Sequence, residues 1–343
     1  MIYIVSLFIF FLIYLSLINY YLKKNEIFID KASITERHKL LLNIKDDKIP
    51  LSGFFYFVPI IFVILFNDNL ITFFFCFALF LVGAMADIKI LISPKIRLFV
   101  QFSLISFYVY LNSQILIDTR IEILNELMNF DILRILIIVF FFLVLINGYN
   151  FIDGVNNLSS INFLIVIFFL CLVSNDLHLN FYNEKIELLI ISLLVFIFLN
   201  FFGKNYLGDG AIYGLSFLIG YMAINITLLD EKISPYFIAN LLWYPAFENL
   251  FSIIRRSFRK KKKYLPDNDH LHQIFYKYLK KKNRIKKNFL LSSVTGIIIN
   301  LYLFCSSYIA YIYYDKTDVL VFILIINIFL YIASYQLFKA LSK

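Results

Sequence analysis

Long apolar runs recur along almost the whole chain and leave few ways in which it can fold. Of its 343 residues, 61% are hydrophobic, and the mean hydropathy is +0.81, whereas soluble domains are closer to half apolar. A helix needs about 20 mainly apolar residues to cross a bilayer. Runs that approach this length cover roughly 2–22, 52–67, 70–86, 97–117, 132–147, 160–175, 187–203, 212–229, 236–254, 289–313 and 318–338. The pattern predicts an all-α polytopic membrane protein, with about eleven transmembrane helices in a single integral membrane domain over 1–343.

Basic residues are unevenly distributed between the loops that join these runs. If the runs alternate in direction, 27 of the 32 lysines and arginines fall on one side. Positively charged loops stay in the cytoplasm, so we expect the N-terminus outside and the C-terminus in the cytoplasm. The net charge of +9 then reflects orientation and anionic lipid head groups rather than nucleic acid. The first run has no basic residue before it and no small-residue cleavage site, which predicts a retained span rather than a signal peptide.

Polar segments interrupt the apolar pattern on the predicted cytoplasmic side. Charge is expensive near hydrocarbon, so polar clusters beside membrane spans are candidates for function. The opposite side has no comparable grouping. The segments on the cytoplasmic side lie at about 23–51, 87–96, 148–159, 204–211 and 255–288.

Three of these segments supply the carboxylates that we consider candidates for the site. Asp87 ends one apolar run, Asp153 ends an Asn-rich stretch, and Asp209 lies between two glycines directly before another run. The N-terminus of a helix attracts anions, and Mg²⁺ typically uses one or two carboxylates together with substrate phosphates. The three carboxylates predict an interfacial site for a metal and a phosphate-bearing substrate. A structural alternative remains for each: a helix cap for Asp87 or Asp209, and a polar turn for Asp153.

Amide, histidine and basic side chains accompany the carboxylates. Asn147 and Asn150 are spaced by three, as are Asn150 and Asp153, which places them on one helix face. His270 and His272 are two apart and cannot share a helix face, although a loop could bring them together. No further soft ligand for zinc lies nearby, so phosphate contact beside Arg255 fits the pair better.

Lys31 lies in the first polar segment, close to the predicted membrane surface. Phosphate recognition is one interpretation of this lysine. The alternative is a charge that only sets the orientation of the first span.

In this order, the segments resemble the polyprenyl-phosphate N-acetylhexosamine-1-phosphate transferases, glycosyltransferase family 4, over nearly the whole chain. The His-x-His form and the number of spans resemble the GlcNAc-1-phosphate transferase branch more than the phospho-MurNAc-pentapeptide transferase branch. The motifs that carry the resemblance are Asp30-Lys31, Arg37-His38, Pro50 to Gly53, Ala86-Asp87, Ser93-Pro94, Arg97-Leu98, Gln101, Asn147, Asn150 to Gly154, Gly208-Asp209, Pro245, Phe247, Arg255-Arg256, Pro266-Asp267, His270 and His272.

The resemblance implies a reaction. An N-acetylhexosamine-1-phosphate would pass from a UDP-sugar to polyprenyl (undecaprenyl) phosphate, UMP would leave, and a surface polysaccharide would be initiated at the bacterial inner membrane. Mg²⁺ would assist, with Mn²⁺ as its alternative. We expect membrane lipids as further partners, no nucleic acid, and leave a homodimer open.

The resemblance also implies roles for individual residues. Asp209 and Asn150 would hold the metal. Asp87 and Asp153 would position or deprotonate the lipid phosphate or support the metal, and Lys31 would bind phosphate. The residues expected to contact the nucleotide sugar are Asn147, Asn156, Arg255, His270 and His272.

Three departures from the family pattern affect this interpretation. Ala86 replaces the first Asp of a usual pair, Asn156 stands where many members have Asp, and Glu248 stands where Asp is usual. The loss at Ala86 leaves open a non-catalytic homologue that binds a lipid or a nucleotide sugar. A transporter fits less well, because the polar residues gather at one interface rather than at mid-membrane.

Overall fold

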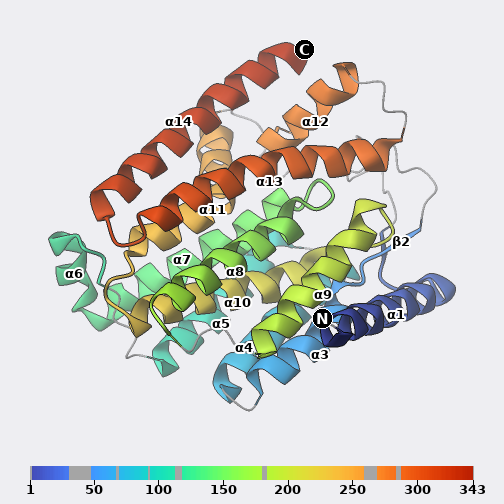
Figure 1. Cartoon of the computed structure of the whole chain (residues 1–343), viewed down its shortest axis with the longest axis horizontal. Helices are drawn as coiled ribbons and strands as arrows, with labels where there is room; N and C mark the ends of the chain where they lie inside the picture. The colour runs from blue at the N-terminus through green and yellow to red at the C-terminus, as the bar shows by residue number, and fades with distance from the viewer. Residues whose placement is uncertain are drawn as a thin grey trace.

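A computed structural model describes residues 2–30, 48–66, 69–91, 93–112, 118–179, 184–258, 269–282 and 287–342. Within these ranges the chain is almost entirely helical (Figure 1). The elements are α1 (Ile2–Asn25), β1 (Ile29–Asp30), β2 (Ile49–Pro50), α3 (Gly53–Leu65), α4 (Leu70–Asp87), α5 (Pro94–Leu111), α6 (Glu122–Met128), α7 (Asp131–Ile152), α8 (Leu158–Asp176), α9 (Glu184–Phe201), α10 (Gly208–Leu229), α11 (Pro235–Phe258), α12 (Leu271–Lys282), α13 (Asn288–Ile312) and α14 (Thr317–Ser342).

Each predicted apolar run corresponds to one helix, which confirms an all-α polytopic membrane architecture. Among the described residues, eight helices are long and apolar enough to cross a membrane: α1, α4, α7, α8, α10, α11, α13 and α14. The predicted count of eleven spans stays a prediction for the other three. Helix α3 has 13 residues and is about 20 Å long, less than the roughly 30 Å hydrocarbon core. Helices α5 and α9 reach 18 residues but carry charged side chains near their N-terminal ends.

The centre of the bundle is formed by α8 and α10, which are largely buried, while α1 and α14 lie at its periphery. Helix α10 packs closely against α4 because Gly83 of α4 faces the backbone of Asp209 and Gly210. A Cβ atom at Gly83 would collide with the carbonyl group of Asp209. The missing side chain thus lets the first turn of α10 approach the last turn of α4.

Local signals in the sequence explain where helices near the site begin. Helix α5 begins at Pro94, which fits the first helical turn because its fixed φ suits the helix and no N–H is lost. The side chain of Asn69 accepts the backbone N–H of Thr72 at 2.9 Å and caps α4. Pro94 and the Asn69 cap thus mark the starts of α5 and α4.

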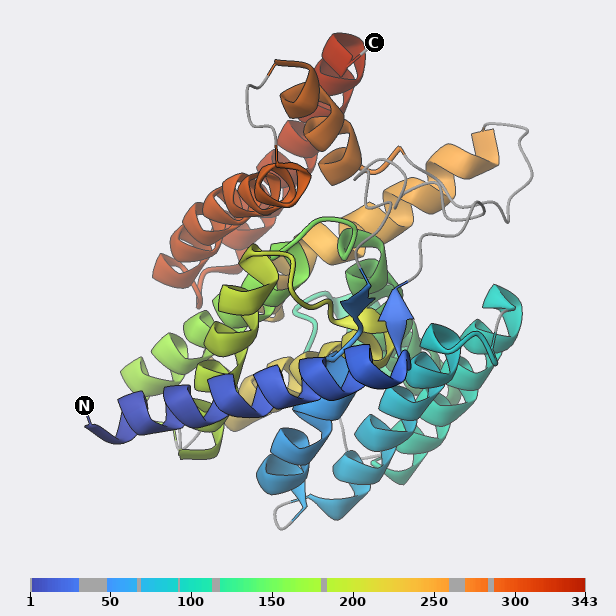
Figure 2. The same ribbon diagram turned by 90° about the vertical axis from the view of Figure 1, so that its right-hand side faces the viewer.

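Three small elements were not predicted from the apolar pattern: the β1–β2 pair, α6 and α12. Strands β1 and β2 are antiparallel and pair Ile29 with Pro50. Leu51 then bridges to Tyr206, which ties the start of α3 to the segment before α10. Figure 2 looks onto the end of the bundle where these strands lie.

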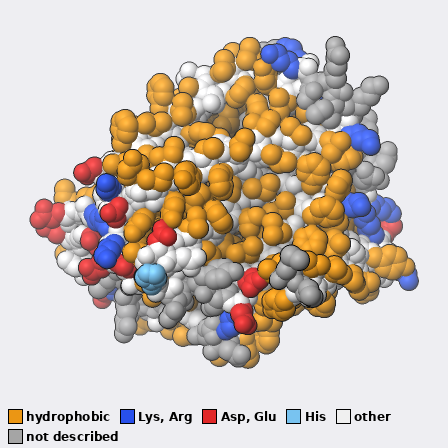
Figure 3. Space-filling model, viewed as in Figure 1, with side chains coloured by type: hydrophobic (Ala, Val, Ile, Leu, Met, Phe, Trp, Pro, Cys, Tyr) orange, Lys and Arg blue, Asp and Glu red, His pale blue; other side chains and the backbone are white. Residues whose placement is uncertain are grey.

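The two ends of the bundle differ in charge (Figure 3). The end with β2 carries mostly lysine and arginine among its charged side chains, whereas acidic side chains, interspersed with basic ones, gather near α6. This asymmetry agrees with the distribution of basic residues in the sequence. The orientation relative to the membrane stays a prediction.

Candidate active site

Asp87 is the last residue of α4, and its carboxylate holds the start of α10. Oδ1 accepts the backbone N–H of Asp209 at 2.9 Å, and Oδ2 accepts that of Gly210 at 3.0 Å. The first N–H groups of a helix lack partners within the helix and carry the positive end of its dipole. Asp87 therefore caps α10 from a neighbouring helix. The sequence predicted an anion at this helix N-terminus, and at these two N–H groups the carboxylate of Asp87 is that anion.

Asp209, in the first turn of α10, forms an ion pair with Arg97 of α5. Nη1 of Arg97 lies 2.7 Å from Oδ2 of Asp209 and 3.4 Å from the hydroxyl oxygen of Tyr213. The two charged side chains are 22% and 27% exposed, so the pair is partly open to water. Nε of Arg97 is buried and has no hydrogen-bond partner within the described part of the chain. Arg97 thus engages Asp209 and keeps a further donor available for an anion.

Asp153 is the C-cap residue of α7, and its side chain is half-buried. The hydroxyl group of Ser159, in the first turn of α8, donates a hydrogen bond to Oδ1 of Asp153. Burial raises the pKa of Asp153 to about 7; the Ser159 hydrogen bond opposes this rise, and the negative charge of Asp209 adds to it. Asp153 can therefore change charge near neutral pH. We call Asp87, Asp153 and Asp209 the carboxylate half of the site.

Asn147 and Asn150 lie on the last turns of α7, as the spacing predicted. The amide nitrogen of Asn147 donates to Oε1 of Gln101 at 3.1 Å and to the carbonyl of Leu143 at 2.9 Å. The Asn147 side chain thus links α7 to α5. Asn150 is half-buried, one turn before Asp153, and makes no hydrogen bond to another described residue through its side chain.

Asn156 lies deeper than a substrate-contact role suggests. It is buried, and its backbone N–H donates to Oγ of Ser292 at 2.9 Å. Its side-chain nitrogen lies 3.2 Å from the carbonyl oxygen of Asn200 and 3.4 Å from Oγ of Ser293. These contacts join the α7–α8 turn to α9 and α13, so in this structure Asn156 holds the turn.

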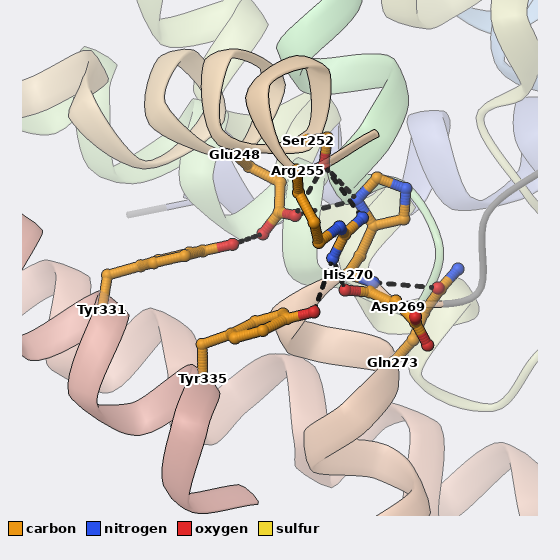
Figure 4. A network of polar contacts seen from close by, with 8 residues as sticks. All are labelled: Glu248, Ser252, Arg255, Asp269, His270, Gln273, Tyr331 and Tyr335. Atoms are coloured by element: carbon orange, nitrogen blue, oxygen red, sulfur yellow. Dashed lines mark hydrogen bonds and ion pairs between the residues drawn. The ribbon is translucent and has the colours of Figure 1, made fainter. Parts of the chain in front are cut away.

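Glu248 of α11 is fully buried and forms the centre of the network drawn in Figure 4. Its Oε1 accepts from Nδ1 of His270 at 2.8 Å, and its Oε2 accepts from the hydroxyl group of Tyr331 at 2.6 Å. Oγ of Ser252 lies 3.4 Å from Oε1 of Glu248 and 3.2 Å from Nδ1 of His270. A buried carboxylate requires such partners, because its desolvation is otherwise too costly.

Arg255 lies on the same helix and points into the same network. It donates to the backbone carbonyl of Asp269 and, at 3.0 Å, to the hydroxyl oxygen of Tyr335. A further contact of 3.4 Å joins it to Oγ of Ser252. The side chain is buried, so Arg255 holds the segment that leads into α12.

His270 and His272 converge although they are two residues apart. His270 precedes α12 and His272 lies in its first turn; their rings stack with centroids 5.6 Å apart and planes 14° apart. A Cβ atom at Gly154 would collide with Nε2 of His272, so this glycine admits the buried ring beside Asp153. The ring of Phe151 lies 5.2 Å from that of His270. We call Glu248, Arg255, His270 and His272 the histidine half of the site, and the α7–α8 turn joins it to the carboxylate half.

The structure therefore brings most of the predicted site residues to one end of the bundle. Asp87, Asp153 and Asp209 converge through contacts between α4, α7 and α10. Lys31 lies outside the described residues, so its predicted role stays a prediction.

Sequence reasoning assigned no role in the site to Arg97, Ser159 or Glu248. Glu248 carried a signal, because it is a carboxylate within an apolar run, where charge indicates function by default. Arg97 belonged to a motif but had no assigned partner. Ser159 had no distinguishing signal, since its partner is set by the turn between α7 and α8.

The donor set of the carboxylate half fits Mg²⁺ better than a softer metal. The described residues contain no group of three histidine, cysteine, aspartate or glutamate side chains arranged to hold a metal. Mg²⁺ needs fewer protein ligands, because substrate phosphates and waters complete its shell. Asp209 offers a partly exposed carboxylate and Asn150 an amide oxygen, and Asp209 would exchange Arg97 for the metal.

Comparison with known proteins locates a family signature in the first two thirds of the chain. Residues 69–227 match the family model described as Glycosyl transferase family 4. No curated protein matches the chain. The matched segment contains the carboxylate half and ends before the histidine half. The matched segment is less than half of the chain, and the match shows that this segment is similar to the glycosyl transferase family 4.

Proposed function

We propose that the protein transfers an N-acetylhexosamine-1-phosphate from a UDP-sugar to polyprenyl phosphate. An oxygen of the polyprenyl phosphate attacks the β-phosphorus of the UDP-sugar. A new P–O bond forms, the bond between the β-phosphorus and the bridging oxygen breaks, and UMP leaves with that oxygen. The product, a polyprenyl diphosphate sugar, would initiate a surface polysaccharide. The GlcNAc-1-phosphate branch of the family is the one we propose.

The observation that carries this proposal is the convergence of three carboxylates from α4, α7 and α10 within the family segment. Asp87 holds the backbone of Asp209, and Asp209 interacts electrostatically with Asp153. Phosphoryl transfer depends mainly on positioning and on stabilisation of charge. A group of carboxylates beside a partly exposed arginine at the end of a helical bundle suits that chemistry.

Asp209 and Asn150 would hold Mg²⁺, or Mn²⁺ in its place. The bound ion would neutralise charge on the diphosphate of the nucleotide sugar. With a metal held by Asp209, Arg97 would be free of this ion pair, and its guanidinium would be able to bind a phosphate group bidentately. The exchange uses the ion pair between Arg97 and Asp209, which is partly open to water.

Asp153 is the residue best suited to receive or hold a proton near the reacting phosphate. Its pKa of about 7 matches the working range of a general base. Proton removal is not obligatory, since a phosphate monoester has its second pKa near about 6. Asp87 would act by holding the first turn of α10 in place. Lys31, Asn147, His270 and His272 keep their proposed contacts with phosphate or nucleotide sugar. The buried side chains of Asn156 and Arg255 would instead act by holding the α7–α8 turn and the segment before α12.

A lipid acceptor and a soluble nucleotide sugar can meet only at a membrane surface. The basic end of the bundle, which carries the site, is the end that we assign to the cytoplasm, in a bacterial inner membrane. Lysine-rich segments there would also attract anionic lipid head groups. Membrane lipids are thus the proposed surroundings of the site, and a homodimer remains a proposal about assembly.

The direct test is release of UMP by purified protein given polyprenyl phosphate, Mg²⁺ and a panel of UDP-N-acetylhexosamines. We expect UMP and a lipid-linked product with at least one sugar, and neither when the lipid acceptor is omitted. Absence of UMP and of lipid-linked product across the panel, from folded protein, would refute the transferase.

A non-catalytic homologue that binds a lipid or nucleotide sugar is the second candidate. It is favoured by Ala86, which lacks the first carboxylate of the family's pair, and by the use of Asp87 as a helix cap. Calorimetry separates the two candidates. Binding of a UDP-sugar without release of UMP in the presence of polyprenyl phosphate would favour the binding protein.

A further inference from the structure

We propose that Glu248 is a positioning residue that sets the orientation and tautomer of His270, so that Nε2 of His270 faces the diphosphate of the nucleotide sugar. This inference rests on the proposed function for the identity of the ligand. The contact between Glu248 and His270 joins α11 to the segment before α12. Glu248 itself would not touch the substrate.

The first argument is the direction of the hydrogen bond. A carboxylate can only accept, so Nδ1 of His270 must carry the proton in its 2.8 Å contact with Oε1 of Glu248. With Nδ1 engaged by Glu248, Nε2 is the ring nitrogen that can take a second proton and donate it to an anionic ligand. Figure 4 shows Nδ1 turned towards Glu248 and Ser252, with the other ring nitrogen turned away from the network. No described residue makes a hydrogen bond to Nε2 of His270.

The second argument is that Glu248 is itself held firmly. Its side chain is fully buried, and its second oxygen accepts from Tyr331 at 2.6 Å. A carboxylate fixed on both oxygens cannot follow a mobile ring, so His270 must adapt to Glu248. At metal sites, removing a partner that orients a ligating histidine typically changes affinity or activity by about 10- to 100-fold, and we expect an effect of similar size at His270.

The third argument is that the backbone next to His270 is also held. Arg255 donates to the carbonyl of Asp269, and the backbone N–H of His270 lies 3.4 Å from Oε1 of Gln273. Ring and backbone are thus fixed by separate contacts. The His270 ring also packs against Phe151 and the stacked His272, two residues that adjoin the carboxylate half.

The chemistry of this arrangement suits an anionic ligand. A His270 ring protonated on both nitrogens would donate from Nδ1 to Glu248 and from Nε2 to a phosphate oxygen. Charge-assisted hydrogen bonds of this kind are roughly twice as strong as neutral ones. The buried carboxylate would supply the balancing negative charge for the ring.

The tautomer can be read directly by ¹⁵N NMR of the full-length protein labelled at histidine. The chain has four histidines, and the spectrum of His270→Asn identifies the His270 signals. We expect a protonated Nδ1 in the native protein, and loss of this preference in Glu248→Gln, whose amide can donate as well as accept. A native His270 protonated only at Nε2 would overturn the proposal, whatever the variants do.

Kinetics and binding supply the second readout. Glu248→Gln should lower kcat/KM for the UDP-sugar by about 10- to 100-fold, and Glu248→Asp, which retains a carboxylate, should recover part of the loss. Tyr331→Phe removes the donor to Oε2 and should have a smaller effect in the same direction. Tyr244→Phe is the matched control, since this buried hydroxyl has no hydrogen-bond partner among the described residues. If Glu248→Gln does not fold, the test is the comparison of kcat/KM between Tyr331→Phe and Tyr244→Phe. Equal kcat/KM values for these two variants would overturn the proposal.

The NMR measurement and calorimetric binding of the UDP-sugar do not require turnover. If no transfer occurs but Glu248→Gln changes the tautomer and weakens UDP-sugar binding, the positioning role stands and the transferase fails. If transfer occurs and Glu248→Gln leaves both the tautomer and kcat/KM unchanged, the transferase stands and the positioning role fails.

Discussion

The carboxylate half and the histidine half of the site hold their charged groups in different ways. Arg97 and Asp209 are 22% and 27% exposed, whereas His270 and Glu248 are 6% and 0% exposed. A partly exposed ion pair contributes at most about 1 kcal/mol, so it can open and accept another ligand. Breaking a buried pair leaves an uncompensated charge and costs about 3–5 kcal/mol. The difference indicates that one half exchanges ligands while the other preserves geometry.

The segment that matches the family model contains one half of the site and excludes the other. Residues 69–227 include Asp87, Asp153 and Asp209, and they end before Glu248 and His270. The half that we expect to exchange ligands is thus the half with a family signature. The following variants test this division, in order of decreasing effect.

Asp209→Ala should cause the largest loss. It removes the proposed metal carboxylate, and loss of one group that stabilises transition-state charge typically costs about 100- to 1000-fold in rate. We expect a decrease of about 1000-fold in kcat for UMP release. Asp230→Ala is the matched control, because Asp230 lies at the opposite end of the same helix and its side chain accepts the backbone N–H of Lys232 at 2.8 Å, far from the carboxylate half. Unchanged turnover in Asp209→Ala would remove this residue from the site.

Asp87→Ala should act on folding as well as on activity. Both N–H groups that the carboxylate caps would lose their acceptor, and loss of a helix cap costs about 0.5–2 kcal/mol. Thermal unfolding in detergent should therefore show a lower midpoint, and Asp87→Asn, which keeps one acceptor, should lie between. A variant that melts like the native protein but is inactive would instead place Asp87 in contact with substrate.

Arg97→Gln should alter metal binding before any substrate is added. Removing the guanidinium frees Asp209 from an ion pair worth up to about 1 kcal/mol, so Mn²⁺ should bind about two- to fivefold more tightly to the substrate-free protein. Titration followed by electron paramagnetic resonance measures this directly. Weaker Mn²⁺ binding in Arg97→Gln would contradict an exchange of Arg97 for metal at Asp209.

Ser159→Ala should give the smallest effect, a shift in pH dependence. The Ser159 hydroxyl stabilises the ionised Asp153 and so lowers its pKa from the value that burial alone would give. Without it the pKa rises above about 7, and the acid limb of kcat/KM should move to higher pH by several tenths of a unit.

Ser160→Ala is the control for this shift, because the buried Ser160 hydroxyl has no hydrogen-bond partner among the described residues. Equal acid limbs in the two serine variants would show that Asp153 does not set the pH dependence.

Hydropathy predicted the helices because span length and apolarity depend on local sequence alone. The convergence of Asp87 and Asp209 also followed from alternating spans. The cap between them did not, since it requires the close approach of α4 and α10 at Gly83. The contact of Glu248 with His270 could not be predicted from the sequence either, because it depends on how the segment before α12 packs against α11. The stacking of His270 on His272 required a helix start between them, which spacing alone does not predict.

The measurement that tests the central claim most directly is the fate of the β-phosphorus of the nucleotide sugar. Purified protein would receive a UDP-N-acetylhexosamine labelled at the β-phosphate, together with polyprenyl phosphate and Mg²⁺. Sugar-1-phosphate transfer predicts that the label and the sugar enter the lipid fraction in equal molar amounts, and that unlabelled UMP is released. Recovery of the label in UDP while the sugar alone enters the lipid would contradict the account.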